Sequence, residues 1–221
     1  MRRAAGSSAV CGWRSLQCEG HHADDLSPGR CRIVIPERFV RALDGFEAVL
    51  AATPPDRWLS PSPCEGWCAV DVAGHVTAGL LVIEMRAAGR PLPQDDPDWR
   101  EVAGEDPLAS WRAVRARMMA ELGPEALARR VRLALGVEVT MREWLEEYPL
   151  ELLVHTWDLA RATGQSVVFD ADLVGPALET ARRMAPAGRG AGMLAPERSV
   201  PEGAGDQARL LALFGRDPAG G

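Results

Sequence analysis

The sequence predicts an all-α fold: a bundle of four long helices with a small β-hairpin insertion and a short C-terminal helix. Apolar residues recur every three or four positions in four separate stretches, as they do along one face of a helix. These stretches cover residues 36–52, 68–89, 107–122 and 141–163. Segments rich in proline and glycine separate them, and only residues 131–139 alternate as a β-hairpin does.

Composition favours one globular domain. The chain has 221 residues, of which 47% are hydrophobic, and a net charge of −6. We expect a domain over residues 36–218, preceded by an extension over residues 1–35. The negative net charge and the lack of a basic patch in the sequence argue against nucleic acid as a partner. No uncharged apolar run reaches the roughly 20 residues of a membrane span, so no membrane partner is expected.

The extension over residues 1–35 differs from the rest of the chain. It has neither a continuous apolar core, as a secretory signal has, nor the cysteine and histidine spacing of a zinc knuckle. Two interpretations remain open: a disordered tail, or upstream sequence added by a misassigned start, with Val34 or Val40 as the true first codon. Five cysteines without a framework spacing predict a reducing, cytoplasmic location.

The first two helices flank a shaped loop. Phe39, Leu43 and Phe46 mark one face of the helix over 36–52. The loop over 58–67 contains two prolines and a glycine, and its tryptophans are expected to pin it to the bundle. The second helix, over 68–89, begins at Cys68, which is a poor N-cap, so we expect its first turn to fray.

The second half of the bundle starts after a long loop over 90–107, of the kind that forms lids or rims. The third helix, over 107–122, is followed by the hairpin. Thr140 and Glu143 form a capping box for the fourth helix, which we expect to run to Gly164. Pro149 lies inside it and predicts a kink at 145–149. A fifth helix over 171–185, a loop over 186–205 and a short helix over 206–214 complete the chain.

The stretch 150–164 carries the chemistry. Glu151, His155 and Asp158 fall on one stripe of a helix that is otherwise apolar nearly all round, so these polar groups are predicted to be buried. A buried charge requires a partner or a metal, and Glu and His four residues apart can share one ion. His75 lies on a second apolar helix, with small residues beside it. We therefore predict a three-ligand metal site of His75, Glu151 and His155 with an open fourth position.

Asp158 has two interpretations. It orients a ligand imidazole by accepting a hydrogen bond, or it forms a salt bridge with Arg161 or Arg182. Cys64 is expected to be a small buried hydrophobe rather than a ligand or a reactive thiol.

The tryptophans are interpreted as core residues rather than stacking platforms. Arg86 lies on the same helix face as His75, where it could meet an anionic substrate. The favoured interpretation is a solvated arginine at the end of the helix.

Four motifs in order resemble one family. They are the loop Pro61-Ser-Pro-Cys-Glu-Gly-Trp67, the segment from Asp71 to His75, the run from Glu151 to Ala162, and the ending from Asp206 to Pro218. Together they resemble the DinB-like superfamily, in particular the metal-binding domain of mycothiol-dependent maleylpyruvate isomerase, over residues 37–218.

The resemblance implies a DinB-like four-helix bundle that binds one divalent metal, usually zinc, through His75, Glu151 and His155. It also implies a low-molecular-weight thiol such as mycothiol as cosubstrate, activated by the metal. Residues 165–218 do not resemble the isomerase's C-terminal domain, so isomerase activity is not implied.

The hypotheses for function are ordered. The first is a metal-dependent thiol transferase-like enzyme that acts on a small-molecule thiol and an electrophile, with no catalytic base identified. The second is a metal-dependent hydrolase, in which the open position activates water. The third is a non-catalytic metal-binding module, such as a homodimer that packs through exposed bundle faces.

Overall fold

The computed structural model describes residues 34–218 except 96, 134–136 and 193. The expectations for the extension over 1–35 therefore lie almost wholly outside the described residues. The elements are α1 (Glu37–Ala52), η1 (Pro55–Arg57), α2 (Ala69–Ala87), α3 (Trp99–Ala103), α4 (Pro107–Glu121), α5 (Pro124–Ala128), β1 (Arg130–Arg132), β2 (Glu138–Thr140), α6 (Met141–Glu147), α7 (Pro149–Thr163), α8 (Ala171–Gly190) and α9 (Asp206–Leu213).

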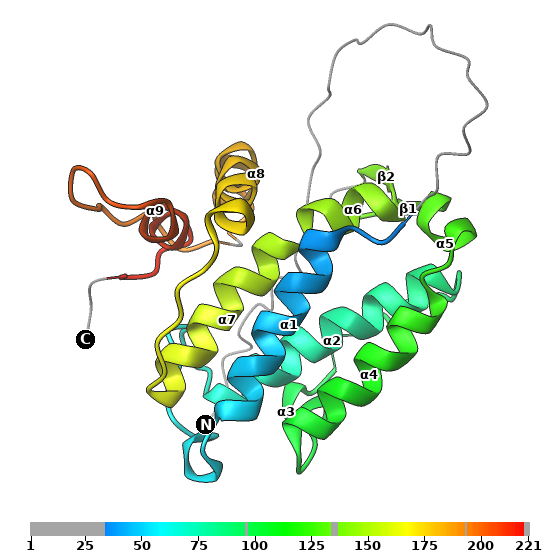
Figure 1. Cartoon of the computed structure of the whole chain (residues 1–221), viewed down its shortest axis with the longest axis horizontal. Coiled ribbons are helices and arrows are strands. Elements are labelled where there is room, and N and C mark those ends of the chain that lie inside the picture. The colour runs from blue at the N-terminus through cyan, green and yellow to red at the C-terminus, as the bar shows by residue number, and fades with distance from the viewer. Residues whose placement is uncertain (1–33, 96, 134–136, 193, 219–221) are drawn as a thin grey trace, which may run out of the picture.

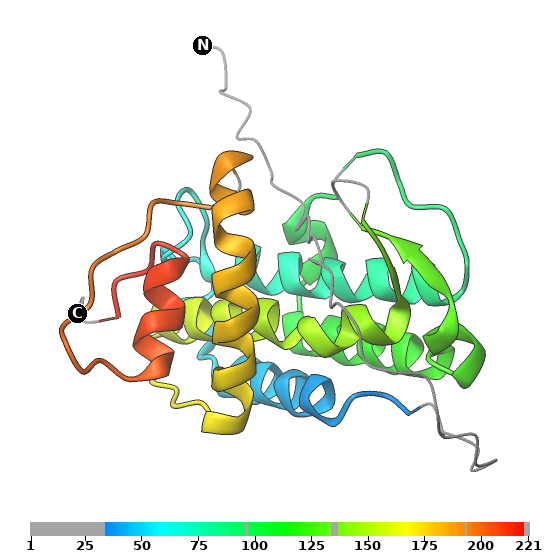
Figure 2. The same ribbon diagram turned by 90° about the horizontal axis from the view of Figure 1, so that it is seen from above.

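Four long helices form the predicted bundle. Helix α1 packs on α7, α2 packs on both α4 and α7, and α1 also touches α4 (Figure 1). Helices α8 and α9 pack against each other beside this bundle, and α8 runs across the direction of the four long helices (Figure 2). None of the described helices is long and apolar enough to cross a membrane.

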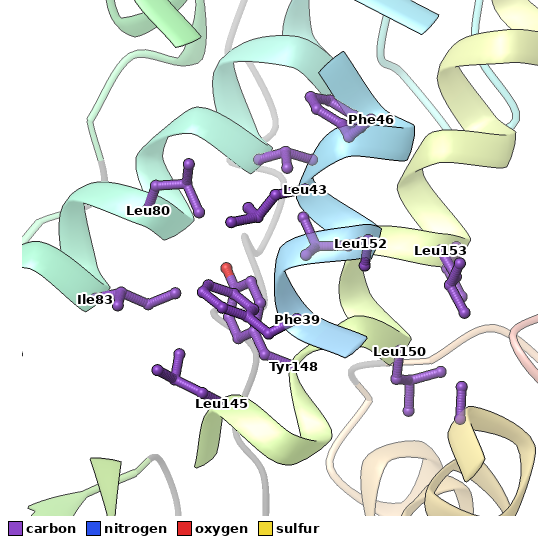
Figure 3. Close-up of a cluster of buried hydrophobic side chains, with 14 of the residues drawn as sticks. Phe39, Leu43, Phe46, Leu80, Ile83, Leu145, Tyr148, Leu150, Leu152 and Leu153 are labelled. Carbon is purple, nitrogen blue, oxygen red and sulfur yellow. The ribbon is translucent and has the colours of Figure 1, made fainter. Parts of the chain in front are cut away.

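The bundle core fills the space between α1, α2, α6 and α7. Phe39 and Phe46 from α1, Leu80 and Ile83 from α2, and Leu150 from α7 are fully buried (Figure 3). The predicted apolar faces are thus the faces that pack. Burial of side chains of this size contributes about 1.5–3 kcal/mol each to stability, before the loss of chain entropy.

The predicted hairpin and capping box are confirmed. Strands β1 and β2 pair antiparallel, with Val131 opposite Val139. The Glu143 carboxylate accepts from the Thr140 backbone N–H at 2.7 Å, and the Thr140 hydroxyl accepts from the Glu143 N–H at 3.2 Å.

The fourth helix, expected to run unbroken with a kink from 141 to 163, is instead divided at the predicted position into two helices. Tyr148 separates α6 from α7, and Pro149 stands in the first turn of α7, where its missing N–H removes no helical bond. Gly164 ends α7 with φ 77°, as predicted for a left-handed cap.

The prediction of a loop over residues 90–107 is wrong in part, because this segment contains α3. The Asp98 carboxylate accepts from the Arg100 N–H at 2.8 Å and starts this short helix. Gly74 allows it to dock: a Cβ there would lie 1.8 Å from the Trp99 carbonyl oxygen. A contact between two backbone segments that are far apart in the sequence leaves no periodic pattern of residues, so the sequence did not indicate this helix. Helix α5, begun by Pro124, was likewise not predicted.

Two other boundaries need correction. Helix α8 continues through Pro186 to Gly190 instead of ending near 185, because one proline removes a single helical bond and does not always stop a helix. The expected fraying at Cys68 is not seen. The Asp71 carboxylate accepts from the Cys68 N–H at 2.8 Å, and loop carbonyls accept from the next two N–H groups.

Candidate metal centre

Helix α7 supplies three polar side chains to the bundle interior. Glu151, His155 and Asp158 are 6%, 8% and 0% exposed. The helix is buried along nearly its whole length, because it packs on α1, α2 and α8. The prediction that these groups are buried is therefore confirmed, and each requires a partner.

Helix α2 brings His75 to the same point. His75 Nε2 and His155 Nε2 each lie 3.1 Å from the same carboxylate oxygen, Oε1 of Glu151. One ligand atom from each of the three residues lies within 4.8 Å of the others. Bonds of about 2.0–2.2 Å to a tetrahedral zinc ion set neighbouring nitrogen and oxygen ligands about 3.3 Å apart. The separations in this cluster are compatible with a single small cation.

The electrostatics keep Glu151 charged. Burial alone would raise the pKa of this carboxyl group, but the charge and hydrogen bond of His155, together with the hydrogen bond of His75, hold it well below its usual value. Burial would lower the pKa of His155, yet Glu151, Asp158 and Cys64 raise it well above its usual value. These shifts keep Glu151 anionic and His155 protonated. A divalent cation bound at this oxygen would replace the proton on Nε2 of His155, because imidazole binds a metal only in its deprotonated form.

A second polar group lies behind His155. Its Nδ1 is 3.0 Å from Asp158 Oδ2, and Arg216 Nη2 donates to that same oxygen at 2.6 Å. Burial would raise the pKa of Asp158, but Arg216 and His155 lower it to about 2. Asp158 therefore makes both kinds of contact that were predicted, one with an imidazole and one in a salt bridge.

The salt bridge of Asp158 with Arg216 was not predicted. Arg182, one of the predicted partners, pairs with Glu179 at 2.7 Å, and the guanidinium of Arg161 lies 5.7 Å from the centroid of the Trp157 ring. Arg216 follows α9, 58 residues beyond Asp158, so helix spacing could not identify it. The only available signal was its place in the C-terminal motif of the resemblance.

Cys64 is closer to the site than expected. Its thiol donates to Asp158 Oδ2 at 3.2 Å, and its Sγ lies 4.0 Å from His155 Nδ1. Arg216 Nη2 approaches the same sulfur at 3.2 Å. The interpretation of Cys64 as a small buried hydrophobe is therefore incomplete, because the half-buried side chain packs against the core and also makes these polar contacts.

Two indoles surround His75. Its ring centroid lies 4.9 Å from that of Trp67 and 5.1 Å from that of Trp99, and Trp67 also stacks near His155 at 6.3 Å. Both tryptophans are half-buried. Trp111, in contrast, is fully buried in the core as predicted. Trp67 thus packs against the core, as predicted, and also against both imidazoles, whereas Trp99 was missed because α3 was missed.

Arg86 lies away from these ligands. It is half-buried, packs over the Trp144 ring at 5.5 Å and donates to the Arg132 carbonyl. Both early interpretations of Arg86 therefore need correction: the side chain supports the hairpin and is not a freely solvated helix end.

Comparison with known proteins identifies the family of this chain. The family model "Mycothiol maleylpyruvate isomerase N-terminal domain" matches residues 39–160. The uncharacterized protein Rv0738 of Mycobacterium tuberculosis (strain ATCC 25618 / H37Rv) is 32% identical over 178 residues, 80% of this chain and 94% of the relative. A second protein of that strain, Rv0036c, is 30% identical over 95 residues, 36% of this chain and 37% of the relative.

One crystal structure shows the same fold. The mycothiol-dependent maleylpyruvate isomerase matches with a TM-score of 0.52 at 20% identity, over 66% of each chain. The present chain therefore spans just under two thirds of that protein. The family-model match covers more than half of the chain, including His75, Glu151, His155 and Asp158. The chain belongs to the mycothiol maleylpyruvate isomerase N-terminal domain family, within the DinB-like fold.

Proposed function

We propose that this protein binds one divalent metal ion, Zn²⁺ by the chemistry of the donors, through His75, Glu151 and His155, and transfers a small-molecule thiol of the mycothiol type to an electrophile. One observation carries the proposal: two imidazole nitrogens from different helices lie 3.1 Å from one buried carboxylate oxygen. Three protein ligands leave a tetrahedral ion one position for an exogenous molecule.

Each residue has a defined part. Glu151 supplies the single negative charge among the ligands, and His155 is oriented through Nδ1 by Asp158. Trp67 and Trp99 pack against the ring of His75. A bound ion lowers the pKa of a coordinated thiol, so that the thiolate is available at neutral pH. The family's name supports the choice of a mycothiol-type thiol.

Metal content tests the ligands. The purified full chain and the variants His75→Ala, Glu151→Gln and His155→Ala would be compared by elemental analysis after limited chelation. We expect about one ion per wild-type chain and a loss of at least 100-fold in affinity for each variant, since a two-ligand remnant rarely holds zinc. Glu179→Gln, an exposed carboxylate on α8, is the control and should retain the ion. Full metal content in both histidine variants would contradict the site.

Activity tests the second half of the proposal. Loaded wild-type protein would be given mycothiol with a panel of electrophiles that includes maleylpyruvate. Thiol consumption would be followed for the panel, and loss of substrate would be followed for maleylpyruvate, because an isomerisation regenerates the thiol. Thiol-dependent turnover that disappears in His75→Ala supports the transferase. Hydrolysis that does not depend on the thiol would favour water activation by the same open position. Stoichiometric metal with neither activity would favour a binding module.

A further inference from the structure

A second group of ligand atoms lies on the far side of His155. Cys64 Sγ, Asp158 Oδ2 and His155 Nδ1 lie within 4.8 Å of one another. The sulfur is 3.2 Å from the carboxylate oxygen and 4.0 Å from the nitrogen, and the oxygen and the nitrogen are 3.0 Å apart. Tetrahedral zinc with one sulfur, one nitrogen and one oxygen ligand has edges of about 3.3–3.6 Å. Shifts of about half an ångström would thus bring all three atoms to bonding distance.

This group differs in chemistry from the first. It includes a thiol, which as a thiolate prefers soft ions, whereas the first set has only nitrogen and oxygen. It uses Nδ1 of the ring, which leaves Nε2 facing Glu151. The loop that carries Cys64 is held in place, because the Trp67 N–H donates to the Cys64 carbonyl and the Ser62 N–H donates to the Trp67 carbonyl.

The guanidinium of Arg216 lies where a metal ion bound to this group would lie. Its Nη2 lies 2.6 Å from Asp158 Oδ2 and 3.2 Å from Cys64 Sγ, and its Nε donates to Asp158 Oδ1 at 3.0 Å. The arginine reaches in from the segment after α9, where its own N–H donates to the Leu211 carbonyl. Withdrawal of this one side chain would expose an anionic oxygen, a thiol and an imidazole nitrogen to the same ion.

We propose that Cys64, Asp158 and Nδ1 of His155 form a second metal site, for a thiophilic divalent ion such as Cd²⁺ or excess Zn²⁺, in competition with the guanidinium of Arg216. Binding releases two protons to solvent, one from the Cys64 thiol and one from Nδ1 of His155, and displaces Arg216 from Asp158. The ion also replaces the contact through which Asp158 orients His155. Occupation of this second site therefore weakens the first, and excess thiophilic metal acts as an inhibitor.

Cadmium titration of the full chain tests this proposal. Sulfur-to-cadmium charge-transfer absorption reports bonds to thiolates, and a difference spectrum against Cys64→Ser isolates the contribution of Cys64. Cys68→Ser is the matched control: its thiol lies in the same loop but faces Arg100 at 3.8 Å. We expect the control to titrate like the wild type, and Cys64→Ser to lose one cadmium equivalent with its absorption.

Arg216 provides the second measurement. Arg216→Gln removes the competing cation and should tighten binding of the sulfur-bound cadmium equivalent by at least about 10-fold, because the ion no longer has to break a buried ion pair. Arg216→Lys keeps a cation and should not tighten it. Identical titrations of wild type and Cys64→Ser, or no effect of Arg216→Gln on folded protein, would overturn the second site. His75→Ala separates the two proposals, because it removes the first site and leaves the Cys64 absorption.

Discussion

The two imidazoles of the site are held in different ways. On α7, His155 places Nδ1 against Asp158, which is in turn neutralised by Arg216. On α2, His75 has a buried Nδ1 with no hydrogen-bond partner among the described residues, and its ring lies between two indoles. One half of the site is positioned by charge and the other by packing. Changes in the two halves should therefore affect different measurements. A change on α7 should lower the affinity for metal, and a change on α2 should disturb the docking of α3 against α2.

The largest effect is expected from a substitution in the α7 half of the site. Asp158→Asn leaves the guanidinium of Arg216, whose side chain is only 14% exposed, without a charged partner. Loss of one member of a buried pair costs about 3–5 kcal/mol in the free energy of unfolding. Metal affinity should also fall about 10- to 100-fold, because His155 loses its orienting acceptor. Chemical denaturation and chelator competition measure the two effects.

A double-mutant cycle sharpens this result. Asp158→Asn combined with Arg216→Gln removes both charges, so most of the lost stability should return while metal affinity stays low. If stability and metal affinity recover together, the carboxylate does not position His155.

The second largest effect is expected from a substitution in the α2 half of the site. Gly74→Ala places a methyl group 1.8 Å from the Trp99 carbonyl oxygen, so α3 must move away from α2. Overpacking of this kind costs about 1–3 kcal/mol. The midpoint of chemical denaturation measures the loss, and Trp99 should become more accessible to a fluorescence quencher.

Gly45→Ala is the matched control, since a Cβ at this helical position meets nothing within 4 Å. Residual metal affinity in Gly74→Ala should exceed that of Asp158→Asn. The reverse order would contradict the division of the site into a charged and a packed half.

The smallest effect concerns the start of α2. Asp71 accepts from the Cys68 N–H at 2.8 Å and from Arg100 Nε at 2.7 Å. Asp71→Ala removes the N-terminal cap and should cost about 1 kcal/mol. Arg112→Ala serves for comparison, because it breaks a more exposed ion pair with Glu47. A loss no greater than that of Arg112→Ala would show that Asp71 does not cap the helix.

The pH dependence of stability provides a second measurement at Asp71. Burial raises the pKa of this carboxyl group, but Arg100 and the Cys68 N–H outweigh burial and lower it below 3.8, its value in the unfolded chain. A depressed folded pKa gives stability that is present above pH 3.8 and is lost as the pH falls through the folded value. Denaturation of wild type and Asp71→Ala should therefore differ at pH 6 and converge in acid.

Sequence periodicity predicted the parts of the fold that depend on one helix at a time. The four long helices, the break before Pro149 and the αL cap at Gly164 each follow from local spacing. Helix α3 did not, because its position depends on a backbone contact with Gly74. The same contrast applies to the site. Glu151 and His155 share a helix face, whereas Arg216 and Trp99 reach it from distant segments.

The position of Arg216 near the end of the sequence has a practical consequence for truncated forms of this protein. The family-model match stops at residue 160, and every candidate ligand of the first site lies before that boundary. A shortened chain cut there would retain His75, Glu151 and His155 but lose the guanidinium that neutralises Asp158. Such a fragment would carry beside its metal ligands a carboxylate that has lost its guanidinium partner. Any comparison of this domain with its relatives should therefore include the tail that follows α9.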